Sequence, residues 1–125
     1  MRLHLIISLA AVAACGGDPV GADTGSTCPT TDPPTYASFG QGFFTAYCLE
    51  CHSQAKLGAD RQGAPVTIDF DTRSLVRENT SRIDQQAASG PTATNRLMPV
   101  AGHAPVPSDA ERVRLGEYIA CEIGR

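Results

Sequence analysis

The segment "PTYASFGQGFFTAYCLECHS", residues 34–53, decides the fold of this 125-residue chain. Its aromatic residues recur at intervals of three and four, the spacing of one helix face: Tyr36, Phe39, Phe43, Phe44 and Tyr47. The proline pair at 33–34 suits a helix start. Gly40 and Gly42 each weaken a helix by up to about 1 kcal/mol relative to alanine, and such glycines often mark the close approach of another element. We therefore expect a helix here that another part of the chain approaches closely.

This helix leads into Cys48, Cys51 and His52, which have the C-x-x-C-H spacing. That spacing is the attachment signature for c-type haem. Two thiols add across the two vinyl groups of the haem, and the adjacent histidine then binds the iron. At a helix end, residues three apart lie on one face, which suits the attachment of a flat macrocycle.

A structural zinc site and a redox dithiol are the alternatives for the same residues. Zinc needs four ligands, and the other candidates, Cys28, Cys121 and His103, are not at zinc-like spacing. A thioredoxin-like dithiol requires a βαβ setting, of which the sequence gives no sign. We therefore expect one covalent haem c, attached through Cys48 and Cys51.

The N-terminus, "MRLHLIISLAAVAAC", has the pattern of an export signal. Arg2 precedes a mostly apolar run, residues 3–14, which is shorter than the roughly 20 residues that cross a bilayer. The end of this run resembles the lipobox of bacterial lipoproteins, in which the cysteine, here Cys15, is lipidated and becomes the mature N-terminus. The alternative is an ordinary signal peptide with Cys15 incidental. We expect a signal peptide over residues 1–14 and a periplasm-facing lipoprotein of the inner or outer membrane.

The remainder of the chain divides into a tether and one domain. Residues 15–27 offer no apolar face, so we expect a flexible tether there. Residues 28–125 form the domain, which is small enough to need help from a cofactor or a cross-link. The net charge of −3 gives no basic footprint, which argues against a nucleic acid partner.

Further helices are expected along this domain. Asp71 or Thr72 suits the N-cap of a helix through "RSLVRE", and "TSRIDQQAA" indicates a second short helix. Ser108 and Glu111 form a capping box before the last helix. Its apolar stripe contains Ala110, Val113, Leu115, Tyr118 and Ile119. Its other side is expected to carry Arg112, Arg114 and Glu117. With almost no strand signal, the fold class is all-α.

From about Tyr36 to Ile123 the chain resembles a small monohaem class I c-type cytochrome. The resemblance rests on the helix before C-x-x-C-H, on a glycine and an aromatic residue within that helix, and on an apolar and aromatic pair in the last helix: Gly40, Phe44, Leu115 and Tyr118. It implies a cytochrome c-like fold in which several short helices and long loops surround one haem. It also implies that the first and last helices cross at the glycine.

The resemblance extends to the iron ligands and the remaining thiols. It implies His52 and Met98 as axial ligands, because Met98, in "RLMPVAGH", is followed by proline in a loop before the last helix. His103 is the competing ligand and is otherwise expected to be a solvated loop residue. Crossing helices would bring Cys28 and Cys121 together in a disulfide, which most members of this family lack; two free thiols are the alternative.

These features together indicate a single-electron carrier rather than an enzyme, because two axial ligands from the protein leave no open site at the iron. We expect a monomer that meets redox partner proteins of the cell envelope and reaches the membrane through lipid on Cys15. The alternative is a haem-based sensor or a haem-bearing subunit of a larger redox enzyme.

The lipobox makes a testable prediction about the location of the protein. Cys15→Ser removes the lipid acceptor, so the variant should leave the membrane fraction or accumulate as unprocessed precursor. Fractionation of cells that express wild-type and variant protein checks this. Wild-type protein that is already soluble in the periplasm contradicts it.

Overall fold

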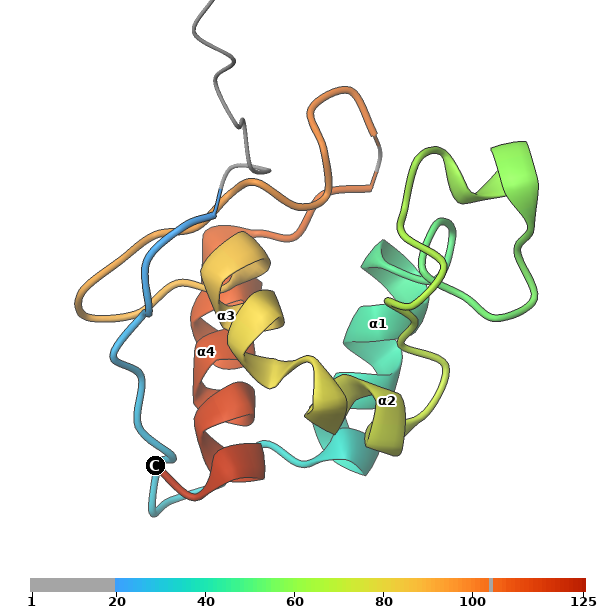
Figure 1. Cartoon of the computed structure of the whole chain (residues 1–125). Coiled ribbons are helices and arrows are strands. Elements are labelled where there is room, and N and C mark those ends of the chain that lie inside the picture. The colour runs from blue at the N-terminus through green and yellow to red at the C-terminus, as the bar shows by residue number, and fades with distance from the viewer. Residues whose placement is uncertain (1–19, 104) are drawn as a thin grey trace, which may run out of the picture.

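The computed structural model describes residues 20–103 and 105–125, which form helices joined by long loops (Figure 1). Within these residues there is no strand, only an isolated bridge between Ser89 and Thr94. The all-α prediction is therefore confirmed. Residues 1–14 and Cys15, the expected signal peptide and lipid site, lie outside the described residues. Among the helices described, none combines the length and the hydropathy needed to cross a membrane.

The aromatic segment forms a π-helical turn, Tyr36–Gly40, that continues into α1, Gln41–Tyr47. The segment begins at Thr35, where a capping box forms because the Thr35 hydroxyl accepts from the Ser38 N–H and the Ser38 hydroxyl accepts from the Thr35 N–H. The predicted helix is thus present, but it ends just before the cysteine motif.

Three further helical segments precede the last helix. A 3₁₀ turn, Gly58–Arg61, interrupts the loop after the motif. The two short helices predicted from sequence are α2, Arg73–Glu78, and α3, Thr80–Ala87. Thr72 is the N-cap of α2, and its side chain accepts a hydrogen bond from the Leu75 N–H.

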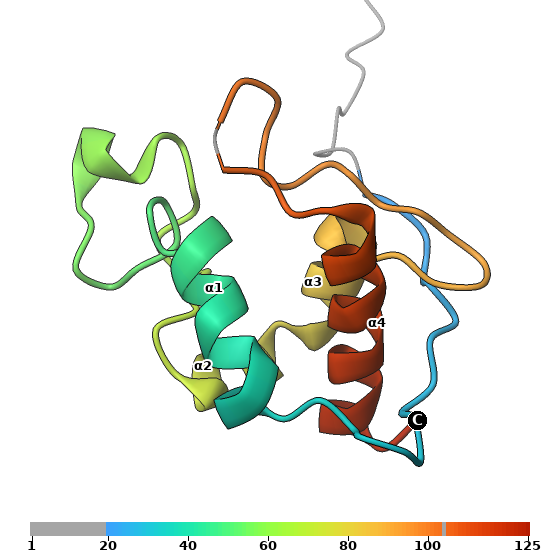
Figure 2. The ribbon, with the colours of Figure 1, turned by 180° about the vertical axis from the view of Figure 1, so that it is seen from behind.

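The last helix is α4, Asp109–Ile123, which begins at the predicted capping box of Ser108 and Glu111. Figures 1 and 2 show α3 alongside α4, and the π-helical turn before α1 contacts α4. The hydrophobic core draws on all four helices and on the loop before α2; its members include Phe43, Phe44, Ile68, Phe70, Val76, Ile83, Ala87, Leu115, Tyr118 and Ile119.

The expected close approach at Gly40 is present. A Cβ atom built on Gly40 would lie 2.9 Å from Cζ of Tyr118, closer than real side chains pack. Tyr118 is fully buried, and its ring lies 6.2 Å from that of Phe44 between centroids. The missing side chain therefore lets the first helical segment contact α4.

The buried face of α4 differs from the predicted one. Arg112, expected on the solvent side, is only 4% exposed, whereas Val113, expected in the apolar stripe, is 45% exposed. The prediction failed because it assumed that a charged residue must face water. Here the side chain is buried, and its Nη1 donates to three backbone carbonyls.

The expected flexible tether is also different in its described part. Residues 21–26, which we call the N-terminal strap, lie against α3 and the loop that follows it. Thr24 is fully buried, and its N–H and hydroxyl donate to the carboxylate of Asp84 at 2.9 and 2.7 Å. The strap is held by hydrogen bonds to a buried carboxylate and not by apolar side chains. The polar composition of the segment therefore did not reveal that it is ordered. The folded domain therefore begins earlier than residue 28.

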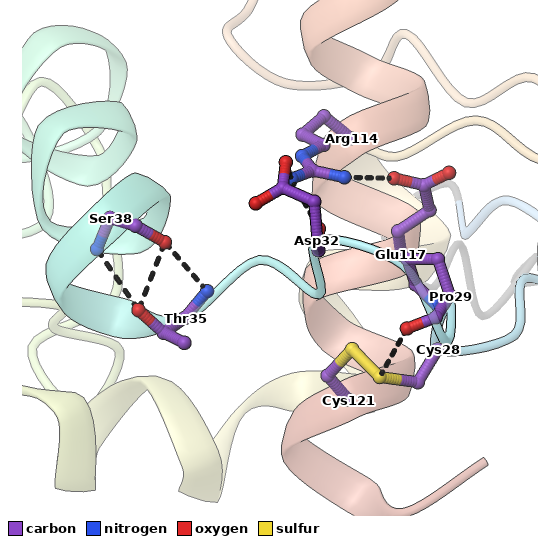
Figure 3. The surroundings of a disulfide bond; sticks show 8 residues. All are labelled: Cys28, Pro29, Asp32, Thr35, Ser38, Arg114, Glu117 and Cys121. Carbon is purple, nitrogen blue, oxygen red and sulfur yellow. Dashed lines mark hydrogen bonds and ion pairs between the residues drawn. A yellow bond between two sulfur atoms is a disulfide. The ribbon is translucent and has the colours of Figure 1, made fainter.

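Cys28 and Cys121 are joined in a disulfide, with their Cα atoms 4.5 Å apart (Figure 3). The segment after Cys28 is also held to α4 by Arg114, whose guanidinium pairs with Asp32 at 2.8 Å and with Glu117 at 3.0 Å. The segment after the N-terminal strap is therefore cross-linked to the end of α4, and a surface ion-pair network also joins the two.

The disulfide should contribute strongly to stability, because it closes a loop with a sequence separation of 93. Replacing both cysteines by serine should lower the free energy of unfolding by up to about 4 to 5 kcal/mol in the chain-entropy model. Urea unfolding of mature protein measures this. A reductant should destabilise the wild type but leave the double variant unchanged. Labelling of both residues as free thiols in native protein contradicts the bond.

Candidate functional site

A cavity of about 390 Å³ lies between α1, the loop after the motif, α3 and the loop before α4. Its volume is within the range of cofactor and small-molecule sites. Apolar and aromatic side chains form much of its wall, among them Phe43, Phe44, Ile68, Phe70, Ile83 and Leu97. The cavity is also lined by every candidate haem-binding residue predicted from the sequence: Cys48, Cys51, His52, Met98 and the competing ligand His103.

The cysteine motif forms a tight turn directly after α1. Cys48 is the C-cap residue, and its N–H donates to the Phe44 carbonyl at 2.9 Å. The N–H groups of Cys51 and His52 then donate to the Cys48 carbonyl at 3.1 and 2.9 Å. This turn brings both thiols and the imidazole to one cavity. Both cysteines are free and partly buried.

The surroundings of the two thiols raise their pKa. Burial raises the pKa of Cys48 to about 12, and the neighbouring Cys51 contributes in the same direction. Burial also raises the pKa of Cys51, and the negative charge of Glu50 raises it further. Redox-active dithiols and thiolate metal ligands depend on a lowered pKa. The surroundings therefore do not favour the dithiol alternative.

The imidazole of His52 has a fixed orientation. Its Nδ1 lies 2.8 Å from the Ile68 carbonyl oxygen, and because a carbonyl only accepts, Nδ1 carries the proton. Nε2 is then the nitrogen with a free lone pair, as in a metal-ligating histidine whose other nitrogen is hydrogen-bonded to the backbone. Burial lowers the pKa of His52, which favours the neutral form that a metal requires.

Sequence reasoning missed Arg61, which organises the loop beneath His52. Its side chain is buried, and it donates to the carbonyls of Ser53 at 2.9 Å and Ile68 at 3.3 Å. It also forms a buried ion pair with Asp69 at 2.7 Å. Arg61 thereby holds the carbonyl that orients His52. Nothing in "LGADRQG" separates this arginine from one on an exposed turn.

Met98 lines the cavity from a separate segment, the loop between α3 and α4. Its N–H donates to the Gln86 carbonyl at 2.9 Å, and its carbonyl accepts from Arg112 at 2.9 Å. The side chain is partly buried and packs against the core. The backbone is therefore held on both sides of the residue whose thioether lines the cavity.

His103 differs from the expectation of a solvated loop residue. It is partly buried and lines the same cavity as Met98, because the loop turns back at Val100, whose carbonyl accepts from the His103 N–H at 3.2 Å. The structure therefore leaves two candidates for one ligand position.

The zinc alternative loses two of its possible ligands, because Cys28 and Cys121 are bonded to each other. Across residues 20–103 and 105–125, no three side chains of His, Cys, Asp or Glu gather as a metal-binding group.

In comparisons with known proteins, no protein-family model, no curated protein and no solved structure matches this chain.

Proposed function

We propose that this chain is a monohaem c-type cytochrome that carries single electrons at the bacterial cell envelope. The observation that carries the proposal is that Cys48, Cys51, His52 and Met98 line one cavity. They come from two segments that are distant in the sequence, the turn after α1 and the loop before α4.

The donor set of the cavity fits a c-type haem. Two thiols in one turn would suit thioether attachment to a haem, and the His52 imidazole, with a free Nε2, would supply one ligand to its iron. The thioether of Met98, from the loop before α4, would supply the other iron ligand. When bound, the haem supplies a one-electron Fe(III)/Fe(II) couple, and Met/His ligation raises its potential.

The chain itself controls the surroundings of that couple. The apolar wall of the cavity excludes water and lowers the local dielectric, which favours the less charged, reduced state. Ile68 and Arg61 hold the His52 ring in one orientation. With both axial positions filled by the protein, the site suits electron transfer without bond-making to a substrate.

The proposed location follows from the lipobox and gains a geometric limit from the strap. Residues 16–20 separate Cys15 from the N-terminal strap, and a chain spans at most about 3.6 Å per residue. Lipid on Cys15 would therefore keep the domain within about 20 Å of the membrane surface. We propose that its redox partners are proteins at that surface, and that it acts as a monomer.

A haem-based sensor, or a haem-bearing subunit of a larger redox enzyme, is the second candidate. The observation in its favour is that His103 lines the cavity together with Met98. The same loop therefore carries a second residue that could replace Met98 as the iron ligand. Carbon monoxide binding by the reduced protein at neutral pH would favour this candidate over the carrier.

Covalent attachment is the first prediction from this proposal. Protein produced together with haem-attachment machinery should keep its haem on a denaturing gel and show the added mass of one haem. Cys48→Ala should leave at most one thioether, and Cys48→Ala/Cys51→Ala should leave none. Cys28→Ser/Cys121→Ser is the matched control, because its thiols lie outside the cavity, and it should keep the haem. Wild-type protein of apo mass from such cells rules out the proposed function.

The second prediction concerns the distal ligand. Oxidised wild-type protein should show the weak far-red sulfur-to-iron band, and the reduced protein should show strongly upfield-shifted methionine methyl signals. Met98→Ala should abolish both and lower the potential, since the stronger ferric ligand His103 lies five residues along the same loop. His103→Ala should leave both intact. The reverse pattern assigns the position to His103.

A further inference from the structure

Arg112 makes an unusual set of contacts at the start of α4. It is 4% exposed, and a single nitrogen, Nη1, lies within hydrogen-bond distance of three backbone carbonyl oxygens. These belong to Ala87 at 2.7 Å, Asn95 at 3.2 Å and Met98 at 2.9 Å. The three carbonyls come from the end of α3 and from two points in the loop that follows. Arg112 therefore ties this loop to two helices at once.

The contacts are not those of an ordinary buried ion pair. No acidic side chain among the described residues forms a salt bridge with Arg112, although seven such bridges occur elsewhere in the same part of the chain. A buried guanidinium must be satisfied by hydrogen bonds, and carbonyl oxygens do so only when the loop is closed. Loop closure and the burial of Arg112 are therefore one event.

We propose that Arg112 is the positioning residue that keeps the Met98 segment closed over the cavity. The inference rests on the proposed function in one respect: Met98 acts as the distal ligand. The Met98 N–H is already tied to the Gln86 carbonyl on α3, and Arg112 supplies the tie to α4. Loss of this buried tie leaves Met98 itself with the hydrogen bond of its N–H, while the loop keeps the exposed ion pair of Arg96 with Asp109 at the start of α4.

A thioether binds ferric iron weakly, so its occupancy depends on how much of the time the loop is closed. An added ligand such as imidazole binds only when the loop opens, and its apparent affinity scales with the open fraction. Removing Arg112 should increase that fraction because it removes charge-assisted hydrogen bonds that exist only in the closed state.

The test compares Arg112→Leu with Arg114→Leu in the ferric holoprotein. Both residues lie on α4, but Arg114 is tied to Asp32 and Glu117 on the surface, away from the cavity. Arg112→Leu should raise the apparent affinity for imidazole by about tenfold or more and weaken the sulfur-to-iron band. Arg114→Leu should change neither. Equal imidazole affinities in the two variants overturn the proposal.

A second control separates positioning from general loss of stability. Ile119→Val thins the core beside the same helix and should lower the melting temperature without raising imidazole affinity. A comparable rise in that variant overturns the proposal, because unfolding in general would then explain the effect. Should Arg112→Leu fail to fold, Arg112→Lys carries the same test. It retains the charge and should give a smaller rise, and an unchanged affinity overturns the proposal.

Hydrogen exchange at the Met98 amide separates this inference from the ligand assignment. That amide is bonded to Gln86 whether or not the thioether binds iron, so Arg112→Leu should make it exchange faster than Arg114→Leu does. If the wild type shows no sulfur-to-iron band, Met98 is not the ligand, yet the exchange rates still decide whether Arg112 holds the segment. Equal rates in both variants refute the positioning role.

Discussion

The contact between Gly40 and Tyr118 is the constraint on which the rest of the structure depends. Because Gly40 has no side chain, the first helical segment approaches α4 until the Tyr118 ring fills the space beside it. The same approach places Phe44 in the core and lets the Tyr47 hydroxyl donate to Glu111 at 2.8 Å. That hydroxyl joins the end of α1 to the start of α4. The cysteine turn and the loop before α4 are therefore held where both line one cavity.

Two buried arginines replace the regular hydrogen-bond ladders that a domain with long loops lacks. Arg61 gathers carbonyls of the loop after the motif, and Arg112 gathers carbonyls of the loop before α4. Backbone polar groups that leave water need such partners. Each arginine contacts the backbone that positions a candidate ligand. Arg61 donates to the Ile68 carbonyl that binds His52, and Arg112 donates to the carbonyl of Met98 itself. The loops are irregular in shape but fixed where they meet the cavity.

The sequence predicted the helices well, because helices depend on local patterns, and the residues it proposed for the site line one cavity. The capping box at Ser108 and the spacing of Cys48, Cys51 and His52 are signals within four or five residues. The expectation that Met98 lies near these residues came from the resemblance to a family, and not from the periodicity of the sequence.

What the sequence did not predict depends on partners distant along the chain. The burial of Arg112 needs the carbonyl of Ala87, and the order of the N-terminal strap needs the carboxylate of Asp84, 60 residues after Thr24. Hydrophobic patterns treat arginine, aspartate and threonine as surface residues. They carry no information on which buried polar groups will meet.

The two halves of the candidate site are held in different ways, and this difference has a consequence. The turn with His52 is fixed within one stretch of chain, by Arg61, Ile68 and their neighbours, over residues 48–71. The Met98 side requires α3 and α4 to be packed together, because Gln86 and Arg112 lie on those two helices. Partial loosening of the domain would therefore release Met98 first, while His52 and the two cysteines keep their arrangement. In the proposed cytochrome, the covalent and proximal attachments would persist through such opening, and the distal ligand would be the one that senses the packing of the fold.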